Sequence, residues 1–238
     1  MYIPNSEVAR VVLERILLAR LTPSAIAYYQ AGSANTAELD YPAFNKLIAL
    51  ASRHARRQPL QLSDAEIIHI KAALPEWNLA EWNLLETLRV ALILSQKNLA
   101  EKSFEDVFTK AFPFADEGEL CALYKTIPFL PEPQRFSWHM KEACRSNMRS
   151  VFSAAACDNP YPVNHFDDIA WRQLVMKAVF IEVPLARIYK LEERLSPTLA
   201  TMAEDYIAER TSAGRSIPAD VELLIGKQSF TAKNYSSG

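Results

Sequence analysis

The chain has 238 residues, a formal net charge of −2, 50% hydrophobic residues and only five glycines. This composition is ordinary for a globular protein with a substantial core, and the scarcity of glycine disfavours β-sandwiches and nucleotide-binding folds that use glycine-rich phosphate turns. No GxGxxG or GxxxxGKS/T motif occurs, and the near-neutral charge gives no general attraction to nucleic acids or anionic membranes.

The cysteines indicate a reducing compartment. Cys121, Cys144 and Cys157 form no CxxC pair and leave an odd number, as is typical of cytoplasmic proteins. The first residues mix charges into an apolar pattern, which favours an amphipathic helix over a signal peptide. No apolar run reaches the roughly 18 residues that a transmembrane helix needs. We therefore expect a soluble cytoplasmic protein with no transmembrane segment.

Apolar residues recur at three- and four-residue steps along the chain, which indicates helices throughout. Thr22 is a suitable N-cap with Pro23 in the first turn, and Ser63 with Glu66 forms a capping box. The helices expected in the N-terminal half span residues 8–19, 23–31, 36–57, 63–70, 78–96, 103–111 and 116–127.

The predicted fold class is all-α. Short connections between helices favour antiparallel neighbours, so we expect a multi-helix α-solenoid-like fold or an irregular bundle of antiparallel helix hairpins. Pro131 and Pro133 mark the clearest internal break. They divide an N-terminal helical region, 1–130, from a C-terminal helical region, 134–226, although one continuous domain is equally compatible. The polar tail 227–238 is expected to be disordered.

One basic cluster stands out, at residues 53–57 with the sequence RHARR. It follows a predicted helix and precedes Pro59. We interpret it as a set of cations at the C-terminal end of the helix dipole. A phosphate-binding patch is the alternative.

A long helix is expected from residue 134 to residue 157, with an apolar stripe beside a face of small side chains. Small side chains permit the close approach of a neighbouring helix, so this helix should be central. Asn147 and Arg149 would then lie near the middle of the packed protein. We expect Arg149 either to reach solvent or pair with a carboxylate, or to contact a ligand. Ligand contact is an alternative because arginine suits bidentate recognition of anions.

The most unusual polar segment follows at residues 158–165, with the sequence DNPYPVNH, and is called the elbow below. Polar groups between packed helices must be satisfied internally or by a ligand. Asn159 and Tyr161 each precede a proline, so both are expected to be extended and rigidly held. Such rigidity suits a binding site, and it equally suits a tight structural corner.

His165 ends the elbow and is the candidate catalytic residue, as a general acid or base. A hydrogen-bonded structural histidine is the alternative. The other histidines, His54, His69 and His139, lie far away in the sequence, and no HxxxH or HExxH spacing exists. We therefore expect no metal site and no cofactor.

Asp167 is a good N-cap for a helix over residues 168–183, which is apolar on nearly every side and is therefore expected to be buried. Lys177 interrupts this helix. Its ammonium group either extends along its own stem to the surface or, if it is buried, becomes a candidate base or anion contact.

Short motifs in the C-terminal third resemble the EboA domain family. The matching motifs are Asn147-Met148-Arg149-Ser150, Asn159-Pro160-Tyr161-Pro162, Phe166-Asp167, Ala170-Trp171, Lys177-Ala178-Val179-Phe180, Pro184-Leu185 with Ile188, Glu193-Arg194, residues 197–206, and Glu209-Arg210 with Ala213-Gly214-Arg215. The chain departs from the family pattern at Arg172, at Thr211 and around Leu191-Glu192.

The resemblance implies an accessory protein of a bacterial gene cluster. Such clusters also encode a prenyltransferase-like membrane protein, a sugar-phosphate-cyclase-like enzyme and metal-dependent hydrolase-like proteins. They are associated with making or exporting a small metabolite, which in some cyanobacteria is the precursor of a sunscreen pigment. The expected partners are other proteins of the same pathway or a small metabolite, and contact with a membrane enzyme is compatible with this.

We therefore predict an accessory or binding protein of secondary-metabolite biosynthesis or precursor export, with a helix-lined pocket or groove near the elbow. The alternative is an enzyme of the same pathway that uses His165 as general acid or base while Arg149 or Lys177 stabilises an anion. A nucleic-acid-binding solenoid would need a continuous basic stripe, which the charge balance disfavours. The predicted ligand-binding residues are Asn147, Arg149, Asn159, Tyr161, His165 and Lys177, and the first five are expected to converge.

Overall fold

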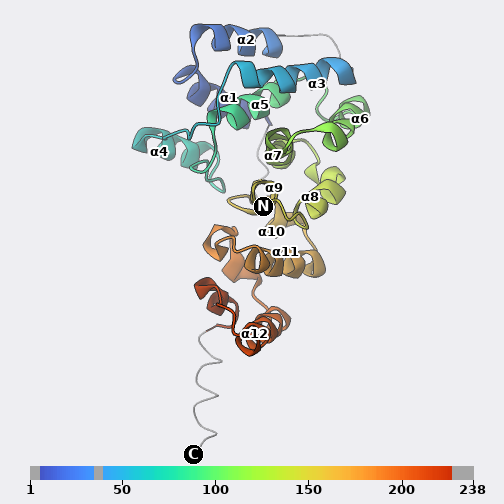
Figure 1. The fold of residues 1–238 in the computed structure, drawn as a ribbon. Coiled ribbons are helices and arrows are strands. Elements are labelled where there is room, and N and C mark those ends of the chain that lie inside the picture. Colours follow the sequence, from blue (N-terminus) through green and yellow to red (C-terminus); the bar gives the residue numbers. More distant parts are fainter. Residues whose placement is uncertain (1–5, 35–39, 227–238) are drawn as a thin grey trace, which may run out of the picture. The chain divides into compact units, whose positions relative to one another are not determined.

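The computed structural model describes residues 6–34 and 40–226 (Figure 1). Within these residues every regular element is a helix, and β pairing is limited to two isolated bridges, between Pro59 and Asn83 and between Cys157 and Ile188. The predicted all-α class is confirmed, whereas a solenoid-like arrangement stays a prediction. The predicted tail 227–238 lies outside the described residues.

Contacts divide the chain into two compact units, residues 1–143 and 144–238. Pro131 and Pro133 lie inside the first unit. A division into separate domains at these prolines stays a prediction.

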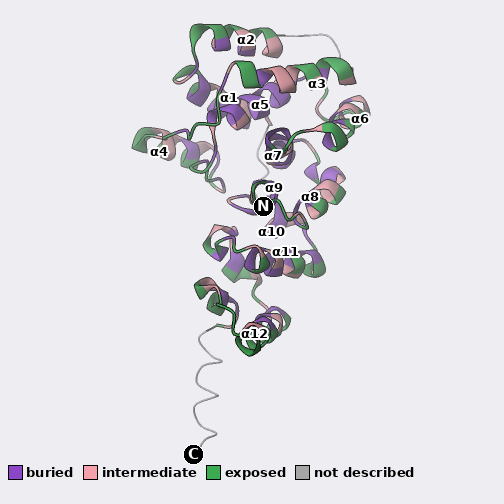
Figure 2. Ribbon diagram, viewed as in Figure 1, coloured by how far each residue is buried: buried purple, intermediate pink, exposed green. Residues whose placement is uncertain are grey.

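The first unit is built around α5 (Leu84–Leu94), in which every residue except Glu86 is buried (Figure 2). A helix that is apolar on all sides must be covered on all sides, and α1, α2, α3 and α7 pack against it. The helices of this unit besides α5 are α1 (Ser6–Leu18), α2 (Pro23–Ser33), α3 (Tyr41–Leu50), η1 (Ala51–Arg53), α4 (Asp64–Ala73), α6 (Lys102–Ala111), η2 (Phe112–Phe114), α7 (Glu117–Thr126), η3 (Ile127–Phe129), η4 (Pro133–Phe136) and α8 (Ser137–Ala143).

Local capping fixes where these helices begin. The predicted cap at Thr22 and the capping box of Ser63 with Glu66 are both confirmed. The start predicted at residue 36 lies outside the described residues; among those described, Asp40 caps α3, whose first helical residue is Tyr41. The start predicted at residue 78 is wrong, because Asn83 caps α5 and residues 78–83 precede that helix.

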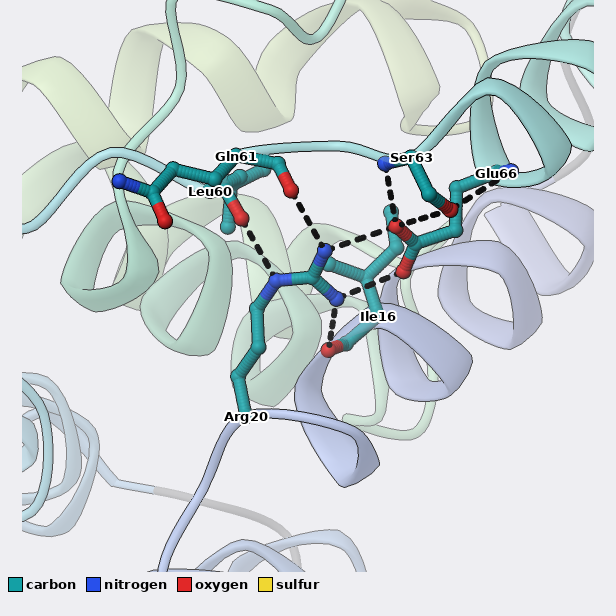
Figure 3. A network of polar contacts seen from close by, with 6 residues as sticks. All are labelled: Ile16, Arg20, Leu60, Gln61, Ser63 and Glu66. Carbon is teal, nitrogen blue, oxygen red and sulfur yellow. Dashed lines mark hydrogen bonds and ion pairs between the residues drawn. The ribbon is translucent and has the colours of Figure 1, made fainter.

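Arg20 joins α1 to α4 through a fully used guanidinium group (Figure 3). Its terminal nitrogens donate to the two carboxylate oxygens of Glu66 at 2.6 and 2.8 Å, and both side chains are largely shielded from solvent. The same group also donates to three backbone carbonyl oxygens, those of Ile16, Leu60 and Gln61. The Arg20 guanidinium lowers the pKa of Glu66 from 4.5 to about 2.

Arg89 is a charged side chain in the middle of α5, and it is 2% exposed. Its Nε donates to the carbonyl oxygen of Ile48 in the last turn of α3 at 3.1 Å. Its Nη2 donates to Glu119 at 3.4 Å, and the other carboxylate oxygen of Glu119 accepts from the backbone of Asp116 in the capping box of α7. Arg89 therefore connects the end of α3 to the start of α7.

The second unit begins with α9 and is organised around α11, whose predicted burial is confirmed for residues such as Trp171 and Leu174. Ile169 and Phe180 lie on its open side and are 62% and 59% exposed. The elements of this unit are α9 (Arg149–Ala156), α10 (Tyr161–His165), α11 (Asp168–Phe180), η5 (Leu185–Arg187), η6 (Leu191–Arg194), α12 (Pro197–Ser212) and η7 (Ala219–Leu224).

The long helix predicted over residues 134–157 is wrong. Helical structure stops after Ala143 and resumes at Arg149. The backbone N–H of Met148 donates to the hydroxyl oxygen of Ser146 at 3.1 Å, a local bond of the kind by which serine competes with the helix. Asn147 and Arg149 consequently lie at the exposed start of α9, not in the middle of a buried helix.

We expect Glu66→Gln to destabilise the protein by about 1.5–3 kcal/mol at neutral pH, because it removes a shielded, charge-assisted pair. The folded-state pKa of Glu66 is depressed, so its stabilising contribution is complete above the ordinary value of 4.5 and is lost as the pH falls towards about 2. The free energy of unfolding, measured by urea denaturation between these pH values, should depend less on pH in the Glu66→Gln variant than in the unmodified protein. As a control, Glu7→Gln breaks an exposed pair with Arg10 and should cost less than about 1 kcal/mol.

We expect Arg89→Met to cost about 3–5 kcal/mol, because it leaves a buried carboxylate without its cation and removes the donor to Ile48. Glu119→Gln also leaves the buried Arg89 cation without its carboxylate, but it keeps an oxygen that can accept from Asp116 and the bond from Arg89 to Ile48, so it should cost less. Urea denaturation of both variants checks this order, and equal losses would contradict it.

Candidate functional site

The elbow begins with an ion pair. Asp158 has a positive φ of 52°, a conformation that aspartate tolerates better than most residues. Its Oδ2 accepts from Nε and Nη2 of Arg187 at 2.9 and 2.8 Å, and its backbone N–H donates to the Arg187 carbonyl oxygen. The first residue of the elbow is therefore fixed from both its backbone and its side chain.

Asn159 is buried and uses its whole amide internally. Its Oδ1 accepts from the backbone N–H of Tyr161 at 2.9 Å, which forms an Asx turn. Its Nδ2 donates to the carbonyl oxygen of Ala154 at 3.4 Å, one of the carbonyls that the end of α9 leaves without a helical partner. Asn159 therefore closes α9 and starts the elbow.

Tyr161 and His165 lie together on α10. Tyr161 was expected to be extended but is the first residue of this helix, because Pro162 is tolerated in a first turn where no backbone donor is needed. Tyr161 is 1% exposed, and its ring centroid lies 4.5 Å from that of the half-buried His165. Burial lowers the pKa of His165, so its imidazole is neutral at neutral pH.

Arg194 holds the other end of the elbow. Its guanidinium stacks over Trp171 at 4.8 Å, its Nη2 donates to Asp168 at 2.8 Å, and its own carbonyl oxygen accepts from the indole of Trp171. Its Nη1 faces three carbonyl oxygens at the end of α10, those of Pro162 at 3.4 Å, Val163 at 3.4 Å and Phe166 at 2.9 Å. One side chain therefore closes α10 and fixes the first turn of α11.

A second polar group lies at the start of α9. Lys177 donates through Nζ to Oδ1 of Asn147 in an exposed contact, as expected if its ammonium extends to the surface. Arg149 donates to the carbonyl oxygen of Glu182, just beyond the end of α11, at 2.5 Å. Both cations are thus held in structural contacts.

The structure places the six predicted residues in two separate groups. One group lies at the start of α9 and consists of Asn147, Arg149 and Lys177, which reaches Asn147 from α11. The other group follows the end of α9 and consists of Asn159, Tyr161 and His165. The eight residues of α9 separate the groups by about 12 Å along the helix axis at 1.5 Å per residue. The binding role of either group stays a prediction.

Sequence reasoning missed the residues that organise the elbow. Asp158, Arg187 and Arg194 make its shaping contacts, although Arg194 belonged to one of the matching motifs. No local pattern links residues 29 positions or more apart in sequence to a turn, as in the pair of Arg187 with Asp158.

The described ranges, 6–34 and 40–226, contain histidine, cysteine and acidic side chains. In these ranges no three histidine, cysteine, aspartate or glutamate side chains are grouped so that they could hold a metal ion. The three cysteines are buried thiols that form no disulfide, and burial raises the pKa of Cys144, which keeps its thiol protonated and unreactive. Across the same ranges, every helix is too short or too polar to cross a membrane.

We expect Arg194→Lys to destabilise the second unit by about 1.5–3 kcal/mol, because lysine cannot reach the α10 carbonyls and Asp168 at once. Arg215→Lys is the matched control, since Arg215 is exposed and should tolerate the change within about 0.5 kcal/mol. Circular dichroism during urea denaturation measures both. Equal losses of stability in the two variants would contradict the role of Arg194 in closing α10 and fixing the first turn of α11.

A family model described as metabolite traffic protein EboA matches residues 10–226. No curated protein and no solved structure matches the chain. The match includes most of both compact units and confirms the resemblance seen in the C-terminal motifs. The chain therefore belongs to the EboA family of metabolite traffic proteins.

Proposed function

We propose that this EboA protein is an accessory component of metabolite traffic that binds a metabolite or a pathway protein without catalysing a reaction. One observation carries the proposal: the polar residues that a catalytic site would need are divided between the two ends of α9 and are held by internal contacts.

The enzyme alternative requires His165 to work beside a cation. A general acid or base must lie within hydrogen-bond reach of the reacting group, and the group that stabilises the developing anion must face the same point. Lys177 lies nine residues along α11 from Asp168, which corresponds to about 14 Å at the helical rise. Arg149 and Lys177 are occupied by Glu182 and Asn147. This arrangement favours binding over catalysis.

In this proposal the elbow is a rigid surface. Arg187 and Arg194 hold its two ends, so His165 is displayed at a fixed position beside Tyr161. A preorganised surface binds with a smaller entropic cost than a flexible loop does. His165 contributes a neutral, half-buried imidazole, which suits a hydrogen bond to a partner.

The proposal places the protein in the cytoplasm, within a pathway of secondary-metabolite biosynthesis or precursor export. The free cysteines support a reducing compartment, and the family name supports a role in traffic. Its partners would be a small metabolite or other pathway proteins, including a membrane enzyme. The small net charge gives no support to nucleic acid as a partner.

The first test compares His165→Gln with His165→Ala in a strain that lacks this protein, with pathway product as the readout. Glutamine preserves hydrogen bonding but cannot act as an acid or base. We expect His165→Gln to retain most of the product and His165→Ala to lose most of it. General acid–base catalysis would instead make both variants lose about 100-fold or more, and that result would overturn the proposal.

The second test separates function from stability. We expect His165→Ala to melt nearly as the unmodified protein does, within about 0.5 kcal/mol, because the imidazole is half-exposed. Trp171→Ala should cost about 3–5 kcal/mol, since this ring is 2% exposed and contacts Arg194. Thermal melts of the purified variants decide the matter. A comparable loss in His165→Ala would show that His165 is a core residue.

A further inference from the structure

The first unit contains a hollow between α2 and α3 with a volume of about 410 Å³. This volume lies within the range of small-molecule sites, about 300–1,000 Å³. The two helices pack against α5 beneath it. The residues that line the hollow are Tyr28, Ala31, Gly32, Ala34, Ala43, Lys46, Leu47 and Leu50.

Small side chains on both helices create this space. A Cβ atom on Gly32 would lie 2.7 Å from Leu92 and 2.9 Å from Leu47, so only glycine permits α2 to approach α5 and Leu47 this closely. Ala31 and Ala43 then leave open the region that larger side chains would fill. The hollow is therefore a consequence of close packing below it and small residues around it.

One wall of the hollow is aromatic and rigid. The Tyr28 ring stacks on His54 with centroids 4.0 Å apart and planes 10° apart. Its hydroxyl donates to the carbonyl oxygen of Leu47 at 2.5 Å. Burial raises the pKa of Tyr28 to about 12, so the hydroxyl keeps this proton. Tyr28 thus offers a fixed ring face to a ligand while its polar group is already satisfied, and fixing the wall in advance lowers the entropic cost of binding.

The lining of the hollow carries one charged side chain among the described residues, and the Asp40 carboxylate lies beside it, accepting from the backbone N–H of Ala43 at 2.8 Å. Lys46 is the charged side chain of the lining, it is exposed, and within residues 6–34 and 40–226 it forms no ion pair. The α2 helix beside it has no acidic residue in its first turn and no basic residue in its last, and its sequence PSAIAYYQAGS carries no charge at all. The hollow therefore combines an apolar lining with a single cation at its edge.

We propose that this hollow binds a free small molecule that has an apolar, partly aromatic body and one anionic group. The body would lie against Tyr28, Leu47 and Leu50, and the anion would face Lys46. The inference rests on the proposed binding function and specifies the chemistry of the metabolite that this EboA protein would carry. Because Lys46 is exposed, its ion pair with the ligand would add little to the binding free energy. Its main effect would be to orient the anionic group.

The test uses the purified chain and two fluorescent probes, the anion 8-anilinonaphthalene-1-sulfonate and its uncharged relative N-phenyl-1-naphthylamine. Ala43→Phe fills the hollow and should abolish saturable binding of both. Lys46→Glu should weaken the anionic probe about fivefold, which is about 1 kcal/mol, and leave the neutral probe unchanged. Circular dichroism melts confirm that each variant is folded.

Matched controls lie on α4, where Lys71 and Ala72 are also exposed. Lys71→Glu and Ala72→Phe should bind both probes as the unmodified chain does. Probe binding that survives Ala43→Phe would overturn the proposal, as would an equal effect of Lys46→Glu and Lys71→Glu. Co-sedimentation with phosphatidylglycerol vesicles that Ala43→Phe abolishes would identify a lipid headgroup site instead, and this would also overturn it.

The product assay distinguishes this inference from the proposed function. If Ala43→Phe loses the probes but still restores pathway product, the hollow is not the metabolite site, whereas the accessory role stands. If pathway product is restored only by variants that bind the probes, both the hollow as the metabolite site and the accessory role stand. If His165→Gln and His165→Ala both abolish product while probe binding is intact, the non-catalytic role fails and the hollow remains.

Discussion

The structure depends on satisfying the carbonyl groups that short helices leave unpaired. The C-terminal end of an α-helix has up to four such carbonyls, and most of the described helices have 13 residues or fewer. Glycine commonly closes helices by adopting a left-handed conformation, yet the chain has only five glycines. Arginine takes over part of this work. Guanidinium groups donate to carbonyl oxygens in the last turns of three helices: Arg20 to Ile16 of α1, Arg89 to Ile48 of α3, and Arg194 to Pro162 and Val163 of α10.

This use of arginine changes how the family motifs are understood. Glu193-Arg194 and Asn159-Pro160-Tyr161-Pro162 read separately as a charged pair and a polar loop. In the structure, Arg194 closes α10 and Asn159 closes α9. These motifs therefore stabilise the fold of the second unit. Most of their polar atoms form the internal hydrogen bonds that hold its tight corner. His165 at the end of the elbow is half-exposed.

The parts of the fold that could be predicted from sequence are those decided within a few residues. Thr22, Ser63 and Asp167 cap their helices as expected, because a capping side chain bonds to the backbone two or three residues away. The helix break near Ser146 was missed because neither glycine nor proline marks it. The candidate site is divided for a different reason: the eight residues of α9 lie between Arg149 and the elbow, a separation of about 12 Å along the helix axis.

The same reasoning indicates where a ligand is best sought. A polar group that already has its hydrogen-bond partners gains little free energy from contact with a ligand. An open apolar surface gains more when a ligand covers it, and here such a surface lies beside a cation that forms no ion pair among the described residues. Around the elbow most polar groups already have partners in the second unit. Between α2 and α3 the reverse holds, because Tyr28 is fixed in place, the surrounding surface is apolar, and Lys46 faces solvent. The proposed ligand is therefore placed at the hollow of the first unit, since the conspicuous polar residues of the second unit are already engaged in holding its helices together.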